Sequence, residues 1–214
     1  NILGKTCTNG SSELMTNLSS SVVNTLFNFQ LMHFAGEDGV AAYGTLMYVN
    51  FIFIAIFLGY SIGSAPIVSY HYGARNSDEL KNLLTKSLKM IGVWGIGLFA
   101  LAQLIASPLA RIFVGYDTDL FALTKHGFRI FCLAFLVNGF NIYGSSFFTA
   151  LNNGLLSALI SFLRTLVFQI AAVLLMPMFL EIDGIWGAVF VAEILTLCVT
   201  LICLVRKRNQ YHYF

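Results

Sequence analysis

The sequence predicts an all-α integral membrane protein, a bundle of six transmembrane helices, and three observations support this prediction. Hydrophobic residues make up 57% of the chain and charged residues only 10%, whereas a soluble domain carries about 25% charged residues. Six apolar stretches recur along the 214 residues, and each approaches the roughly 20 residues that an α-helix needs to cross a bilayer. The stretches are too long for tilted β-strands of about ten residues, and a helix satisfies its own backbone groups within lipid.

Apolar runs and the turn signals between them place the predicted helices. We expect one transmembrane lobe over residues 13–205, with helices at about 13–34, 46–70, 88–106, 126–151, 155–179 and 185–205. A polar lead-in segment, residues 1–12, precedes the lobe, and a basic tail, residues 206–214, follows it. Pro108 is expected to end the third helix before a loop at residues 109–125, and Asn152-Asn153-Gly154 is a tight-turn signal.

The second predicted helix combines small residues with a proline. Gly59 and Gly63 are four residues apart, so they share a helix face and allow another helix to approach closely. Pro66 follows them, and it removes a backbone donor and bends a helix. Pro177, near the end of the fifth predicted helix, is expected to act in the same way.

The first predicted helix is the least hydrophobic, and its polar residues fall on one face. Asn17, Ser21, Asn24 and Asn28 recur at three- or four-residue spacing, which places them on the same side of an α-helix. A stripe of this kind does not face lipid. Its side chains either bond to neighbouring helices or line a wet cavity, and the sequence leaves both interpretations open.

Two charged residues lie near the middle of predicted helices. Arg164 and Glu193 approach from opposite sides of the membrane, and their depths agree within roughly one helical turn. A charge at that depth is costly unless it is paired or hydrated. One hypothesis is a structural ion pair between the fifth and sixth helices. The other makes Glu193 a proton carrier, because burial disfavours the charged form of a carboxylate.

Glu13 opens the first predicted helix and is the second candidate for ion coupling. An acidic side chain in the first turn interacts favourably with the helix dipole and can bond free backbone amides. A capping role is therefore the simpler hypothesis for this residue.

The distribution of lysine and arginine predicts the orientation in the membrane. Six spans place both termini on one side, where the following basic residues gather: Lys5, Arg75, Lys81, Lys86, Lys89, Arg206, Lys207 and Arg208. The other side has fewer basic residues and most of the acidic ones: Arg111, Lys125, Arg129, Glu37, Asp38, Asp117, Asp119, Glu181 and Asp183. By the positive-inside rule the first side, with both termini, is cytoplasmic.

Several classes of function are disfavoured by the sequence. The net charge of +2 and the absence of a basic stripe argue against a nucleic-acid partner. The four cysteines show no CxxC spacing and the four histidines have no evident partners, so no metal site or cofactor is expected. No catalytic motif is present, which argues against a membrane enzyme. The first residue is Asn1 and no signal peptide precedes the spans, so we expect a part of a longer protein.

Motifs along nearly the whole chain resemble the multidrug and toxic compound extrusion (MATE) transporters. Each motif is weak alone, but their order and spacing together are specific. They are Asn9-Gly10-x-x-Glu13, the stretch of residues 36–76 with its Ala41-Ala42-Tyr43 and Gly63-Ser-Ala-Pro66, Asn152-x-Gly154 followed by Arg164, Pro177, Gly184-Ile-Trp186-Gly, and Ala192-Glu193.

The resemblance implies a fold, a function and a partner. Family members have two six-helix lobes around a central cavity, and this chain resembles the C-terminal lobe, so an N-terminal lobe is the expected partner. The implied function is export of small amphipathic cations in exchange for Na⁺ or H⁺ by alternating access, with the ion transported rather than held as a cofactor. The bacterial, small-regulator-linked multidrug branch is the most similar, which implies a bacterial plasma membrane.

The sequence departs from the family at two positions of interest. Some branches carry a cation-binding glutamate on the first helix of this lobe and an aspartate on the fourth, and Ser21 and Asn138 stand at those positions. Neither side chain ionises, so that type of cation site is not expected. The resemblance makes these residues candidates for a drug cavity that acts by hydrogen bonding: Ser21, Asn24, Asn28, Asn138 and Asn141.

Other functions remain open at this point. The lobe could be a half-size transporter that pairs with itself. It could also be a flippase for a lipid-linked sugar, although the polar face of the first helix carries no basic residue. From another class, it could be a membrane interaction protein that transports nothing.

Overall fold

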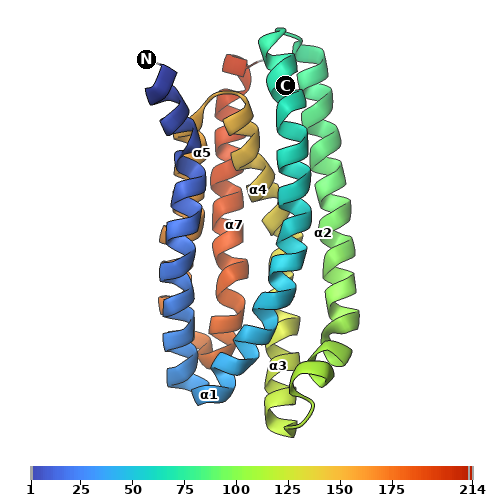
Figure 1. The fold of residues 1–214 in the computed structure, drawn as a ribbon, viewed down its shortest axis with the longest axis vertical. Helices are drawn as coiled ribbons and strands as arrows, with labels where there is room; N and C mark the ends of the chain where they lie inside the picture. Colours follow the sequence, from blue (N-terminus) through green and yellow to red (C-terminus); the bar gives the residue numbers. More distant parts are fainter. Residues whose placement is uncertain (1, 212, 214) are drawn as a thin grey trace.

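The structure, a computed structural model, describes the backbone of residues 2–211 and 213 and the side chains of residues 17–211 and 213. The described residues form a bundle of long helices that run side by side along one axis (Figure 1) and contain no strand. The predicted all-α membrane fold is confirmed. Five helical segments are long and apolar enough to cross a membrane.

The helices follow one another with very short connections. In chain order they are α1 (Ile2–Gly73), α2 (Ser77–Val114), α3 (Thr118–Phe131), the 3₁₀ turn η1 (Cys132–Ala134), α4 (Phe135–Ala150), α5 (Gly154–Phe162), the π-helical η2 (Leu163–Phe168), α6 (Gln169–Leu175) and α7 (Pro177–Tyr211). Because α1 reverses direction at one end of the bundle (Figure 1), its two halves are separate passes and the chain traverses the bundle six times.

The reversal of α1 occurs at Gly36, where φ is 62° and ψ is −149°. This backbone conformation is accessible at low cost to glycine alone. The turn that follows is tight. A Cβ on Gly39 would lie only 2.9 Å from the Leu31 carbonyl oxygen, so a larger residue would not fit there. The ring of Phe27 stacks on that of Tyr43, with centroids 5.2 Å apart, and joins the two halves of α1.

The helices extend beyond the predicted membrane spans, and the loop predicted at 109–125 is wrong. The predicted span 88–106 is part of α2, which runs from Ser77 to Val114, and the predicted loop at 109–125 shrinks to residues 115–117. Asp117 caps α3, and its Oδ1 accepts from the amides of Asp119 (2.9 Å) and Leu120 (3.0 Å). The predicted bounds followed the apolar run, whereas helical hydrogen bonding continues into the polar residues at each end.

The terminal segments are helical as well. The predicted lead-in segment, residues 1–12, belongs to α1 from Ile2 onward, and the predicted tail continues α7 as far as Tyr211. The predicted span 46–70 likewise lies inside a longer helix, the second half of α1.

The prolines do not interrupt the bundle as expected. α2 continues through Pro108, and α1 continues through Pro66 without a non-helical residue at that point. Pro177 begins α7 instead of lying near the end of the fifth span. At the first position of a helix the backbone N–H has no partner within the helix, so proline loses nothing there. α7 then changes direction at Glu181, where φ is 50°.

Close helix contacts occur at glycines other than the predicted ones. A Cβ on Gly59 or Gly63 would meet nothing within 4 Å, so these residues do not bring α1 against another described helix. Instead, a Cβ on Gly139 would lie 2.6 Å from the Phe57 ring, and one on Gly144 would lie 2.4 Å from the Thr200 methyl group. These contacts hold α4 against α1 and α7.

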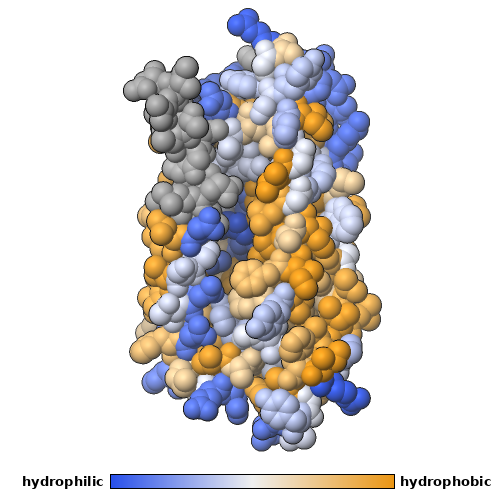
Figure 2. Space-filling view, viewed as in Figure 1, coloured by the Kyte–Doolittle hydropathy of each residue, from blue (hydrophilic) through white to orange (hydrophobic). Residues whose placement is uncertain are grey.

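The exterior of the bundle suits a lipid environment. Figure 2 shows apolar residues over most of the middle of the molecule and hydrophilic residues at both ends. Large apolar side chains such as Leu104 and Val93 are exposed on α2. Such a surface would be unstable in water and is typical of a protein that spans a membrane.

Candidate functional site

A cavity of about 280 Å³ lies between the two halves of α1 and the helices behind them. Figure 2 shows hydrophilic side chains in a hollow on this face of the molecule. The wall is amphipathic. Its polar residues are Asn17, Ser20, Asn24, Asn50, Asn138, Arg164, Thr165, Gln169 and Glu193, and its aromatic residues are Phe27, Tyr43, Phe51 and Phe131.

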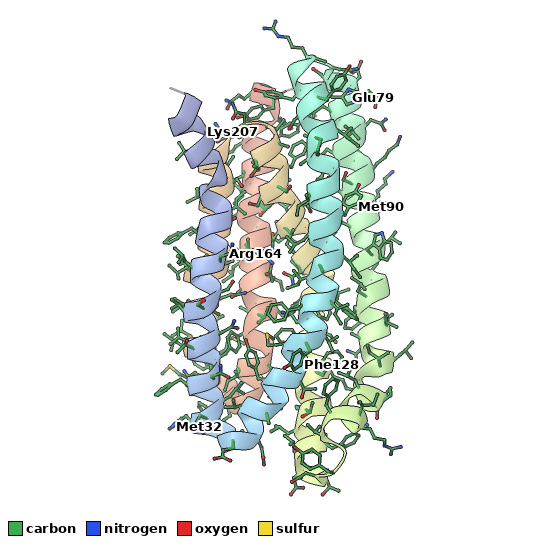
Figure 3. The ribbon with its side chains drawn as sticks, in the orientation of Figure 1. Met32, Glu79, Met90, Phe128, Arg164 and Lys207 are labelled. Atoms are coloured by element: carbon green, nitrogen blue, oxygen red, sulfur yellow. The ribbon has the colours of Figure 1, made fainter. Side chains whose placement is uncertain are left out.

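An ion pair stands at the inner wall of this cavity. Arg164 Nε donates to Glu193 Oε1 at 2.8 Å, and Figure 3 labels Arg164 near mid-height of the bundle. The Glu193 side chain is 1% exposed and that of Arg164 is 14% exposed. Arg164 is therefore the member of the pair that a molecule in the cavity would meet.

Asn141 completes the shell around the carboxylate. Its Nδ2 donates to Glu193 Oε2 at 2.7 Å and to the Glu193 backbone oxygen at 2.8 Å. Its Oδ1 accepts from Thr200 Oγ1 at 3.1 Å. Both carboxylate oxygens of Glu193 thus have a donor, which is what a buried charge requires to be stable.

The guanidinium of Arg164 has a second partner. Arg164 Nη2 donates to Asn138 Oδ1 on α4, so α4, α7 and η2 are joined through one polar network. Such a network rigidifies a bundle when every member is satisfied.

The local backbone explains how Arg164 reaches the cavity. Arg164 and Thr165 both line the cavity and both belong to η2, a π-helical turn. π-helical turns are rare, widen the helix and occur frequently at functional sites. Thr165 Oγ1 donates to the Ser161 carbonyl oxygen at 2.7 Å and satisfies part of the altered backbone.

The structure separates the five cavity candidates into three groups. Asn24 and Asn138 line the cavity, and Asn24 Oδ1 accepts from the Tyr43 hydroxyl at 2.9 Å. Asn141 is fully buried behind the wall, against Glu193. Ser21 and Asn28 are exposed and are not part of the wall.

The error at Ser21 and Asn28 has a geometric cause. Asn17, Ser20 and Asn24 line the cavity. They are three and four residues apart, so they lie on the same face of the α-helix. The predicted stripe also includes Ser21 and Asn28, which are exposed and do not line the cavity. Glu13 lies outside the residues whose side chains the structure describes.

Sequence reasoning missed three cavity residues, two of which carry a readable signal. Asn50 interrupts a long apolar run, and Gln169 does the same in the fifth predicted span. An isolated amide inside a membrane span is expected to face protein or water. Tyr43 carries no such signal, because its position opposite Asn24 depends on the turn at Gly36.

Comparison with known proteins connects this chain to a family. The MatE family model matches residues 14–175. The Probable multidrug resistance protein YoeA of Bacillus subtilis (strain 168) is 22% identical over 210 residues, which cover 93% of this chain and 43% of that protein.

Solved structures show the same fold. A crystal structure of MATE in the straight conformation superposes with a TM-score of 0.90 at 19% identity, over 100% of this chain and 48% of that one. An outward-facing multidrug resistance MATE family transporter of the MOP superfamily gives a TM-score of 0.89 at 18% identity, over 97% of this chain and 47% of that one.

The relative and the solved structures are matched over a similar share of their length. This chain spans less than half the length of the relatives that it matches. The family model covers most of the chain, from residue 14 to residue 175, and agrees with the resemblance seen in the sequence motifs. The chain belongs to the MATE family.

Proposed function

We propose that this chain is the C-terminal lobe of a secondary multidrug exporter that moves amphipathic cations out of the cell in exchange for a coupling cation. Membership of the MATE family supports transport, and the similarity to a probable multidrug resistance protein supports the type of substrate. The observation that carries the proposal is the Arg164–Glu193 pair at the wall of an amphipathic cavity.

The lining of the cavity suits an amphipathic cation. The buried, stacked rings of Phe27 and Tyr43 make part of the wall apolar, and the exposed ring of Phe51 offers a face for cation–π interaction. Amide side chains such as Asn24 and Asn50 supply hydrogen bonds that do not fix one substrate. While Glu193 is ionised it neutralises Arg164, so the wall does not repel a bound cation.

The ion pair offers a physical route for coupling. A proton that binds the Glu193 carboxylate removes its charge and weakens its bond to Arg164, which leaves an uncompensated guanidinium at the cavity wall. That charge opposes a bound cation, so a proton and a cationic substrate exclude each other. Because binding free energies are linked reciprocally, the substrate must also promote release of the proton.

The same geometry favours H⁺ over Na⁺ as the coupling ion at this site. Both oxygens of Glu193 already accept hydrogen bonds, from Arg164 and Asn141. A sodium ion would need several oxygen ligands, and the amide oxygens beside the pair, Asn138 Oδ1 and Asn141 Oδ1, already accept hydrogen bonds. A proton needs only one of the oxygens.

Alternating access to the cavity would require a second lobe. An N-terminal lobe would close the open side of the cavity, and the two lobes would rock to expose it alternately to each side. The end of the bundle that carries Arg75, Lys81 and Lys207 would face the cytoplasm of a bacterial cell. In this mechanism the chain catalyses no chemical reaction and holds no cofactor.

One observation favours a second candidate, a flippase for an anionic lipid-linked substrate. The sequence argument against it was that the polar face of the first helix carries no basic residue, yet the structure places Arg164 in the cavity wall. A substrate with a phosphate group would bind this guanidinium and would be insensitive to competition by amphipathic cations.

The test is transport by the complete protein that carries this lobe. Glu193→Gln keeps the size of the side chain but cannot bind or release the proton. We expect efflux of a cationic dye to fall at least tenfold and to lose its pH dependence, with protein abundance near that of wild type. Glu37→Gln, an exposed acid at the end of the bundle, is the control. Wild-type efflux and pH response in Glu193→Gln would contradict the proposal.

A further inference from the structure

A second cavity, of about 300 Å³, opens at the other end of the bundle from the Gly36 turn. Its wall comes from the turn between α1 and α2 and from the last turn of α7, and it includes His71, Tyr72, Arg75, Gln210 and Tyr211. Three membrane-spanning helices begin or end around it. The cavity therefore lies at a hydrophilic end of the bundle (Figure 2).

The groups around this cavity are mostly hydrogen-bond donors. Among the described residues, the Arg75 guanidinium has no hydrogen-bond or ion-pair partner. The Tyr211 hydroxyl oxygen accepts from Asn153 Nδ2 at 2.8 Å, so its own hydrogen remains available. Gln210 Oε1 already accepts from Lys207 Nζ at 2.8 Å. This excess of donors suits a ligand that is rich in acceptors.

Arg75 has a φ of 55°, the left-handed conformation in which many helices end. The Asn76 amide donates to the His71 carbonyl oxygen at 3.0 Å and closes this cap at the end of α1. One polar atom beside the turn is unsatisfied, because His71 Nδ1 is buried and has no hydrogen-bond partner in the described part of the chain.

The charges around the cavity favour an anion. Lys81 follows on α2, and Arg206, Lys207 and Arg208 lie just before the cavity on α7; Figure 3 shows Lys207 near this end of the bundle. Asp78 and Glu79 also lie nearby. Neither these acids nor the four basic residues line the cavity, whose wall contains the guanidinium of Arg75. Basic pockets between helices on the cytoplasmic side are typical sites for acidic lipid head groups.

We propose that this cavity binds the phosphate-bearing head group of an anionic phospholipid. Arg75 would bind the phosphate through its guanidinium, and the Tyr211 hydroxyl would donate a second hydrogen bond. The ring of Tyr72, which contacts that of Tyr211 at a centroid distance of 5.7 Å, would form the side of the site. The binding is independent of the transported substrate and of the Arg164–Glu193 pair.

The test uses Arg75→Gly, a substitution that separates binding from folding. Glycine adopts a φ of 55° without steric cost, so this variant should unfold in lipid-free detergent at the same temperature as wild type or higher. Thermal unfolding of the purified protein is then followed in mixed micelles with phosphatidylglycerol or phosphatidylcholine. Lys86→Gln, an exposed cation on α2 that does not line the cavity, is the matched control.

We expect phosphatidylglycerol, and not phosphatidylcholine, to raise the unfolding temperature of wild type and of Lys86→Gln. Arg75→Gly should bind phosphatidylglycerol at least tenfold more weakly, because a charge-assisted bond is lost, and native mass spectrometry should find the retained lipid missing. An undiminished response in Arg75→Gly would overturn the proposal. An equal response of wild type to inorganic phosphate alone would identify free phosphate as the ligand and overturn the lipid assignment.

Discussion

Replacing Asn141 by alanine tests whether the buried polar network holds the bundle together at its centre. The substitution removes one amide that makes three hydrogen bonds. Nδ2 donates to Glu193 Oε2 at 2.7 Å and to the Glu193 backbone oxygen at 2.8 Å, and Oδ1 accepts from Thr200 Oγ1 at 3.1 Å. The site is fully buried, so water would not replace these bonds in the variant.

The magnitude follows from the character of the bonds. An interhelical hydrogen bond within a membrane contributes about 0.6 kcal/mol on average and at most about 1.7 kcal/mol. Three ordinary bonds would therefore contribute about 2 kcal/mol. The bond to the carboxylate is stronger, because charge-assisted bonds are about twice as strong as neutral ones. We expect Asn141→Ala to lower the free energy of unfolding by about 2.5 kcal/mol.

Equilibrium unfolding in mixed micelles, with circular dichroism as the readout, measures this quantity. Asn50→Ala is the control, because the Asn50 amide makes only a 3.9 Å contact with Met47 Sδ. Its expected loss is below about 0.5 kcal/mol. An Asn141→Ala variant within that margin of wild type, or an Asn50→Ala variant that loses as much, would refute the reasoning.

Two further predictions concern backbone positions where only glycine fits. Gly139→Ala should lower the free energy of unfolding by about 1–3 kcal/mol, because its Cβ would lie 2.6 Å from the Phe57 ring. Gly97→Ala, where the space is open, should be neutral within error in the same unfolding assay. Gly36→Ala should lower it by about 1–3 kcal/mol, because alanine is strained at a φ of 62°. Gly44→Ala, at a helical position with open space, is the control. If Gly36→Ala and Gly44→Ala lowered the free energy of unfolding equally, the α1 turn would not depend on glycine.

Much of the fold could be predicted because membrane helices are read from apolar length. The predicted proximity of Arg164 and Glu193 rests on the same rule, because the residue count along each span gives both side chains a similar depth. In the structure Arg164 Nε lies 2.8 Å from Glu193 Oε1. The roles assigned to these two residues stay predictions. Helix ends were less predictable, because polar residues continue α2 and α7 beyond the apolar run.

The composition of the cavity could be predicted only in part. Which of two adjacent residues, Ser20 or Ser21, faces the cavity depends on how far α1 is rotated, and that is set by contacts with other helices. The π-helical turn that carries Arg164 has no sequence signature that distinguishes it from ordinary helix. Asn50 was detectable in principle, since it interrupts an otherwise apolar span.

Proton release on substrate binding tests the central claim most directly. The complete protein is placed in weakly buffered detergent solution with a pH indicator, and a cationic dye is added. If the substrate and the Glu193 proton exclude each other, wild type releases protons when the dye binds. Glu193→Gln, whose neutral side chain leaves Arg164 uncompensated, should bind the dye more weakly and release no protons. Binding without proton release in wild type, or equal release from Glu193→Gln, would contradict coupling through the Arg164–Glu193 pair.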